Sequence, residues 1–211
     1  MIYVESKIIN YLGQLRIYSL LDLVFLLLAV KTTALSFFGI IILHIGFLLF
    51  LEENHAHKNR VKFPKYLWIL FFIVGTILYP SYCVVGYLIF SYLYTKKNKP
   101  YFGAFASVFR GLQNYVLFSG ILGFFNIYSI GIGLLFFIRN ALGDFRDIVK
   151  DKKENTQTLP VILGFKKDYK YLHLIFLLIT TTIWWYFSGI YFIWLIVGYI
   201  IEIGTYWLTP R

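Results

Sequence analysis

Three aspartates lie close together in a polar segment between two apolar stretches of this chain. Asp144, Asp147 and Asp151 are separated by three and then four residues. On one continuous helix this spacing places all three carboxylates on the same face. Carboxylate oxygens suit Mg²⁺, which commonly bridges them to the phosphates of a substrate. The spacing therefore indicates a magnesium-binding set, although a solvated acidic loop between two membrane helices would show the same residues.

A second polar segment offers related chemistry. Glu52, His55 and Asn59 repeat the three-then-four spacing, and Glu53 and His57 form a competing face. All are metal-ligand or hydrogen-bonding residue types, so we expect a second ligand set that opposes the aspartates across a cavity. Two alternatives stay open. One is a polar loop that is merely solvated, and the other is a zinc or iron site built on the His-x-His pair.

Basic side chains near these segments could neutralise a phosphate group. Lys96 and Lys97 lie in a third short loop, where they could bind phosphate or serve only as topology anchors. Arg110 and Asn114 share one helix face within an apolar segment. Charge inside a membrane is costly, which makes such residues functional candidates. Arg110 could contact a diphosphate, or it could pair with Asp22 at a similar depth.

The composition places these residues in a multi-pass protein of the cell membrane. Of the 211 residues, 59% are hydrophobic and only 14% are charged, whereas soluble domains carry about 25% charged residues. The net charge of +10 would suggest nucleic acid in a soluble protein. Here the basic residues lie in short loops between apolar runs, where they report topology. We therefore expect a lipid bilayer and no nucleic acid as partner, and a single transmembrane domain over residues 1–211.

An all-α bundle of about eight transmembrane helices in four hairpins is expected. The four pairs lie within residues 17–51, 66–94, 102–138 and 171–208. Their turns fall near Lys31, at Pro80, near Gly123 and at Ser188. The run at 66–94 could instead be one long tilted helix. That would place basic loops on both sides of the membrane, whereas eight helices keep the polar loops and both termini in the cytoplasm.

The aspartate-rich segment resembles a motif of the UbiA-type intramembrane prenyltransferases. Asp144-x-x-Asp147-x-x-x-Asp151 is followed after six residues by Thr158-Leu159-Pro160 and then Gly164. This is similar to the second aspartate-rich motif of that family and the TLP-like tripeptide after it. Other matching positions are Arg16, at the start of the first helix, and Tyr94-Thr95-Lys96-Lys97, between the fourth and fifth helices. The resemblance covers nearly the whole chain.

Two features of the chain depart from the family pattern. The first aspartate-rich motif is usually NDxxDxxxD, whereas this chain has Leu51, Glu52, His55 and Asn59 at those positions. Histidine at the middle position weakens a second Mg²⁺ site, because Mg²⁺ prefers oxygen ligands. The family usually has nine helices, whereas eight are expected here, so the lateral wall of the cavity would either be incomplete or be completed by a partner.

The resemblance implies a Mg²⁺-dependent enzyme of isoprenoid biosynthesis, which transfers a prenyl group from a polyprenyl diphosphate to an apolar or aromatic acceptor. It implies that Mg²⁺ is held by Asp144, Asp147, Asp151, Glu52, His55 and Asn59. The diphosphate would be contacted by Arg16, Lys96, Lys97, Arg110 and Asn114. The 18 Tyr, 22 Phe and 5 Trp suit a polyisoprenoid pocket and an allylic cation. The alternatives are a non-catalytic relative that binds an isoprenoid lipid, and a small membrane transporter or scaffold.

Overall fold

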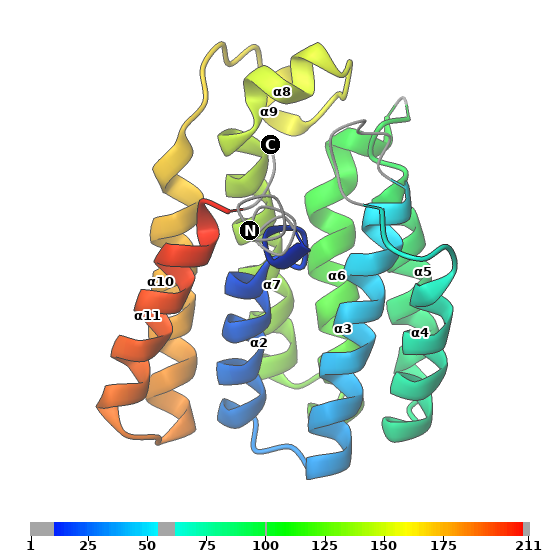
Figure 1. Ribbon diagram of the computed structural model, residues 1–211, viewed down its shortest axis with the longest axis vertical. Helices are drawn as coiled ribbons and strands as arrows, with labels where there is room; N and C mark the ends of the chain where they lie inside the picture. The colour runs from blue at the N-terminus through cyan, green and yellow to red at the C-terminus, as the bar shows by residue number, and fades with distance from the viewer. Residues whose placement is uncertain (1–10, 55–61, 100, 209–211) are drawn as a thin grey trace, which may run out of the picture. The chain divides into compact units, whose positions relative to one another are not determined.

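Helices connected by turns make up the part of the chain that the computed structural model describes, namely residues 11–54, 62–99 and 101–208 (Figure 1). No strand occurs in these ranges, which confirms the all-α prediction for them. In chain order the helices are α2 (Ile17–Ala29), α3 (Ala34–Asn54), α4 (Leu67–Leu78), α5 (Cys83–Thr95), α6 (Phe102–Leu122), α7 (Ile127–Arg146), α8 (Ile148–Lys153), α9 (Leu159–Ile162), α10 (Lys170–Ser188) and α11 (Phe192–Tyr206).

The predicted hairpin turns coincide with the observed helix ends. The run at 66–94 is two helices, because α4 ends at Leu78 and α5 begins at Cys83, on either side of Pro80. Proline lacks an amide hydrogen and restricts the residue before it, so the helix cannot continue there. Gly123 and Gly189 have positive φ values of 95° and 70°, which end α6 and the α10 segment in conformations that suit glycine.

Several helices have the length and composition of membrane spans. Within the described residues, α3, α7 and α10 are long and apolar enough to cross a membrane. The shorter apolar helices are α2, α4, α5 and α11. A helix of 13 residues, such as α5, is about 20 Å long, which is less than the roughly 30 Å of a bilayer core. A membrane protein is therefore indicated, and the crossing of all eight helices, with both termini cytoplasmic, stays a prediction.

The described residues form two compact units. The first contains residues up to Pro80 and those from Leu178 onward, and the second contains residues 81–177. Helix α10 begins in the second unit and ends in the first. The single domain over residues 1–211 stays a prediction, and each unit is described by itself below.

In the first unit, α2 packs on α11 and α3 packs on α4. The α3–α4 connection is fixed by Glu53, whose Oε2 accepts hydrogen bonds from the Tyr66 backbone N–H at 3.0 Å and from Trp68 Nε1 at 2.7 Å. Buried polar side chains link α2, α10 and α11 through hydrogen bonds. Thr180 donates to Asp22 at 3.1 Å, and the Thr181 hydroxyl donates to Glu202 at 2.6 Å.

In the second unit, α6 packs against both α5 and α7. The α6–α7 approach is close, because a Cβ built on Gly111 would lie 2.8 Å from Phe137 Cβ and 2.9 Å from the Gly133 carbonyl oxygen. The short helices α8 and α9 follow α7 and pack at its end (Figure 1). Glycine at position 111 therefore sets the spacing of the two helices that carry most of the candidate site.

Candidate functional site

The three aspartates do not share one continuous helix. Helix α7 ends at Arg146 and α8 begins at Ile148, with Asp147 between them at φ −112° and ψ 20°. The helical hydrogen bond from Val149 to Phe145 is replaced by two others. Val149 N–H donates to the Asp168 carboxylate at 2.8 Å, and the Phe145 carbonyl accepts from Tyr169 N–H at 3.0 Å. The predicted stacking on a single helix face is therefore wrong, because the segment before α10 interrupts the helix.

Asp144 is held by α6. It lies on α7 with 9% of its surface exposed, and its Oδ2 accepts a hydrogen bond from Ser107 Oγ at 2.7 Å. Serine donates a single proton here, so the bond orients the carboxylate and leaves its other oxygen available to a ligand. The α6–α7 spacing thus controls where the Asp144 carboxylate points.

Asp151 is the most deeply buried carboxylate of the three, with a side-chain exposure of 1%. Its Oδ2 accepts from Thr158 Oγ1 at 3.0 Å. Its Oδ1 has no hydrogen-bond donor among the described residues, and Lys97 Nζ lies 3.9 Å away. Burial raises the pKa of Asp151 above its ordinary value and outweighs the attraction of Lys97. Cation binding at Oδ1 would satisfy this oxygen and favour the ionised carboxylate.

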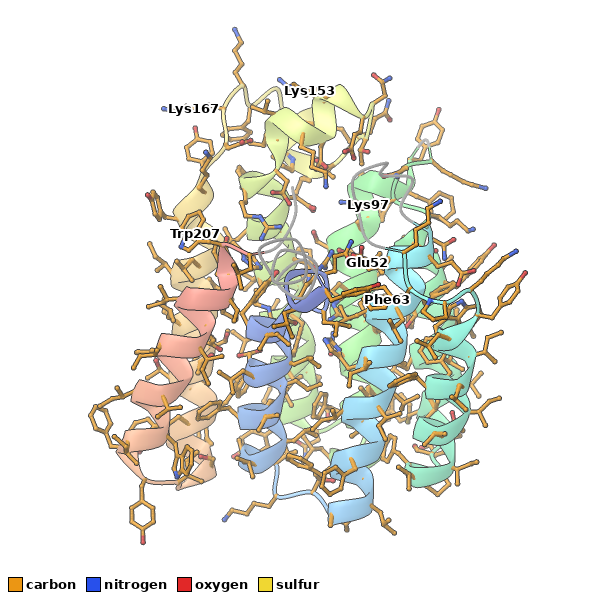
Figure 2. All side chains as sticks on the ribbon, in the orientation of Figure 1. Glu52, Phe63, Lys97, Lys153, Lys167 and Trp207 are labelled. Atoms are coloured by element: carbon orange, nitrogen blue, oxygen red, sulfur yellow. The ribbon has the colours of Figure 1, made fainter. Side chains whose placement is uncertain are left out.

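Lys97 brings a positive charge to the site. Burial alone would lower its pKa, but Asp151, Tyr94, Asp144 and Asp147 together raise it above the ordinary value. The ammonium group therefore stays charged at neutral pH and lies among the aspartates. Figure 2 labels Lys97, which is 15% exposed. Lys153 and Lys167, also labelled there, are exposed at the surface of the second unit.

Asp147 is engaged differently from the other two aspartates. Arg146 donates from Nε to Oδ1 at 2.8 Å and from a terminal nitrogen to Oδ2 at 2.6 Å. Although burial alone would raise the pKa of Asp147, this two-point ion pair lowers it to about 2. Both carboxylate oxygens have a strong cationic donor. Asp147 could bind a metal only if Arg146 released it.

Two of the aspartates have the chemistry of Mg²⁺ ligands. No group of three or more His, Cys, Asp or Glu side chains within residues 11–54, 62–99 and 101–208 is close enough to hold a metal ion. Mg²⁺, however, is commonly bound by one or two carboxylates together with substrate phosphates and water. Asp144 and Asp151 offer oxygen ligands of that kind, and the buried Oδ1 of Asp151 has no hydrogen-bond donor among the described residues.

The predicted phosphate-binding residues are divided between different environments. Lys97 lies beside Asp151, whereas Lys96, which follows α5, has its Nζ 4.4 Å from the centroid of the Tyr92 ring of that helix. Arg110 is buried within α6 and donates to Gln113. Asn114, one turn further along α6, is also fully buried. Of the two loop lysines, the structure thus places only Lys97 beside the aspartates.

The remaining predicted residues belong to the first unit or lie outside the described residues. Arg16 precedes α2 with a positive φ of 49°, and Glu52 is half-buried in the last turn of α3. His55 and Asn59 lie outside the described residues. The opposed ligand set therefore stays a prediction. Asp22 belongs to the first unit, so its predicted pairing with Arg110 is likewise untested.

The supporting roles of three residues were not predicted from the sequence. Ser107 and Arg146 hold the aspartates directly, and Thr158 gives the TLP-like tripeptide a structural role. A spacing signal existed for Ser107, which lies seven residues before Asn114 on one face of α6. No comparable signal existed for Arg146, because adjacent residues rarely pair so closely.

A hydrogen-bonded contact between the loop that follows α5 and the loop that follows α8, called the clasp below, positions Lys97 and Asp151. Thr156 Oγ1 donates to Asn98 Oδ1 at 3.1 Å, and Thr156 N–H donates to the Asp151 carbonyl at 2.8 Å. Gly103 allows the loops to meet. A Cβ on it would lie 2.7 Å from the Gln157 carbonyl oxygen and 2.9 Å from that of Lys97. Both neighbours are backbone atoms, so a side chain there would have to separate the loops.

Gly103→Ala is therefore expected to open the clasp. Amide hydrogen exchange over residues 151–158 should accelerate about tenfold, which corresponds to a local destabilisation of about 1.4 kcal/mol. Exchange is measured by mass spectrometry in detergent. Gly204→Ala is the matched control, because no atom lies within 4 Å of its Cβ position, and it should leave this segment unchanged. Equal exchange in both variants would show that the loops are held elsewhere.

Comparisons of the whole chain with known proteins do not assign a function to these residues. No family model, curated protein or solved structure matches this chain. Its function is therefore inferred from the buried aspartates, Lys97 and the residues that orient them.

Proposed function

We propose that this chain is a membrane-embedded prenyltransferase, which transfers a prenyl group from a polyprenyl diphosphate to an apolar or aromatic acceptor in a Mg²⁺-dependent reaction. The observation that supports this most strongly is the buried Oδ1 of Asp151, which has no hydrogen-bond donor among the described residues and faces Lys97 at 3.9 Å. A diphosphate bound with a metal ion supplies both the cation for this oxygen and the anion for the lysine. The sequence resemblance supports the same activity.

Each residue of the site has a defined role in this proposal. Asp144 and Asp151 would hold Mg²⁺, and Ser107 and Thr158 orient these carboxylates. Bound Mg²⁺ would neutralise the diphosphate and stabilise it as it leaves. Lys97 pairs with Asp151 at a distance too long for a hydrogen bond, so its N–H groups can turn to a phosphate oxygen. Its charge then stabilises the leaving group.

The setting of the site agrees with a lipid substrate. Asp144 lies in the last turn of α7, which is apolar enough to cross a membrane, and Asp151 follows in α8. A diphosphate held here would place its prenyl chain along the apolar helices. We propose that the end of α7 that carries Asp144 faces the cytoplasm, because the loops that follow α5 and α7 are rich in basic residues.

A second candidate function is a non-catalytic protein that binds an isoprenoid diphosphate lipid. The two-point ion pair between Arg146 and Asp147 favours this second function. Both oxygens of Asp147 accept from Arg146, so this carboxylate would not be available as a metal ligand. Such a protein would retain the donor lipid at Asp144, Asp151 and Lys97 without transferring its prenyl group.

The test is an assay of purified protein in detergent with Mg²⁺, geranylgeranyl diphosphate and a panel of lipophilic acceptors. We expect diphosphate release with some acceptor and a return to background after chelation by EDTA. Binding of radiolabelled donor is measured in parallel. Mg²⁺-dependent binding without turnover would support the second candidate, and the absence of both binding and release by folded protein would refute both.

A further inference from the structure

One helical turn of apolar side chains is exposed in the second unit. Leu159, Ile162 and Leu163, in and directly after α9, are 41%, 56% and 62% exposed. Their spacing of three and then one residue places them on the same side of the turn, called the apolar face of α9 below. Pro160 is buried, and α9 packs against α6, α7 and α8. The apolar face is therefore the outward side of an element that the second unit holds from within.

The charged side chains around the apolar face are segregated. Within residues 147–170 the acidic side chains are buried or half-buried. Asp151 accepts from Thr158, and Asp168 accepts from the Val149 N–H. The exposed lysines of the same range are Lys152, Lys153, Lys166, Lys167 and Lys170. The outer surface that flanks the apolar face is therefore basic.

The length of α7 sets the level of this surface. Helix α7 has 20 residues and is apolar enough to cross a membrane. Twenty helical residues extend about 30 Å, which matches the hydrocarbon core of a bilayer. Helices α8 and α9 pack at the end of α7 that carries Asp144, and Figure 2 shows Lys153 and Lys167 at that same end. An α7 that spans the core thus leaves α9 at the boundary between acyl chains and headgroups.

An anionic bilayer surface fits both parts of this surface. Apolar side chains at this level enter the outer acyl region, while lysine side chains extend their charged ends to the lipid phosphates. Clusters of lysines beside a membrane helix attract anionic lipids. A nucleic acid or an acidic peptide would pair with the lysines and leave Ile162 and Leu163 in water.

We propose that the apolar face of α9 inserts into the bilayer surface and that Lys166 and Lys167, which follow it, bind the headgroups of anionic phospholipids. This contact does not depend on prenyl transfer. It has a consequence for the candidate site, because α9 begins directly after Thr158, which orients Asp151. The bilayer then supports, from outside, the segment that holds this carboxylate.

Quenching of a fluorescent label by lipids tests this assignment in the full-length chain. Leu163→Cys is labelled with nitrobenzoxadiazole, and the native Cys83 is buried, which directs the label to position 163. The protein is reconstituted in phosphatidylcholine nanodiscs. These contain the same small fraction of either phosphatidylglycerol or phosphatidylcholine with a nitroxide on its acyl chain. We expect both lipids to quench, and the anionic lipid to quench about fivefold more efficiently, the effect of one lysine near the surface.

The variant that combines Lys166→Gln with Lys167→Gln should lower this ratio below about twofold. Quenching by phosphatidylcholine should persist in it, because the apolar face is unchanged. Lys31→Gln is the control, since Lys31 is an exposed lysine between α2 and α3 of the first unit, and it should keep the ratio.

Three results would overturn the assignment. Absence of quenching by both lipids would show that the apolar face is not inserted, and an emission spectrum typical of apolar surroundings would then mean that protein covers it. Equal quenching by the two lipids before the lysines are changed would exclude binding of anionic headgroups. A ratio that the double lysine variant retains in full would exclude Lys166 and Lys167 as its source.

Discussion

Asp151→Asn is expected to lower Mg²⁺-dependent prenyl transfer by about 100-fold or more. The amide has the shape of the carboxylate and can still accept the hydrogen bond from Thr158. It lacks the charge that would bind a cation at Oδ1 under the proposed function and that attracts Lys97 at 3.9 Å. The change therefore removes the electrostatic role of the residue and retains its packing. The measurement is kcat/KM for geranylgeranyl diphosphate over a Mg²⁺ titration.

Two further variants make this result specific. Asp168→Asn is the matched control, because Asp168 accepts a backbone hydrogen bond from Val149, which an amide oxygen can also accept. We expect its activity to stay within about twofold of the wild-type value, as for conservative changes outside a site. Asp147→Asn should cost less than Asp151→Asn, because Arg146 already engages both oxygens of Asp147. The reverse order would mean that the Arg146 pair opens and that Asp147 is the principal ligand.

Gly111→Val is expected to destabilise the protein by about 3 kcal/mol, the upper range for forcing extra volume into a packed core. The first added carbon would lie 2.8 Å from Phe137 Cβ and 2.9 Å from the Gly133 carbonyl oxygen. Neither atom is the end of a flexible side chain, so α6 and α7 would have to move apart. The free energy of unfolding is measured by denaturant titration in mixed micelles.

The control for this variant is Gly131→Val on α7. No atom lies within 4 Å of its Cβ position, and we expect a change within about 0.5 kcal/mol, as at unencumbered positions. Because the α6–α7 approach also sets the bond from Ser107 to Asp144, Gly111→Val should weaken activity in the protein that remains folded. Equal stability of the two variants would contradict the close packing of α6 on α7.

The helical framework was largely predictable because its signals are local. The break between α4 and α5 follows from Pro80, and the ends of α6 and α10 lie beside Gly123 and Gly189. Each of these residues constrains its own backbone, so no distant contact is needed. The long apolar runs likewise predicted membrane character, which is indicated by α3, α7 and α10.

The arrangement of the aspartates was not predictable in the same way. The spacing rule assumes an unbroken helix, and the hydrogen bonds that break it come from Asp168 and Tyr169, about twenty residues further along the chain. The rule also treats the three carboxylates alike. In the structure each has a different partner, and those partners come from α6, from the adjacent residue and from the segment before α9.

The sequence by itself determined the helical class, the turns and which residue types could bind a metal and a diphosphate, because these depend on local backbone preferences and on hydrophobicity. Only the tertiary structure decided which of those side chains meet. It places Lys97 rather than Lys96 beside Asp151. It also pairs the Asp147 carboxylate with the Arg146 guanidinium. The Asn114 side-chain oxygen has no hydrogen-bond donor among the described residues. The physical reason is that a hydrogen bond or ion pair requires contact at about 3–4 Å, which spacing along the chain does not specify once the helix is interrupted.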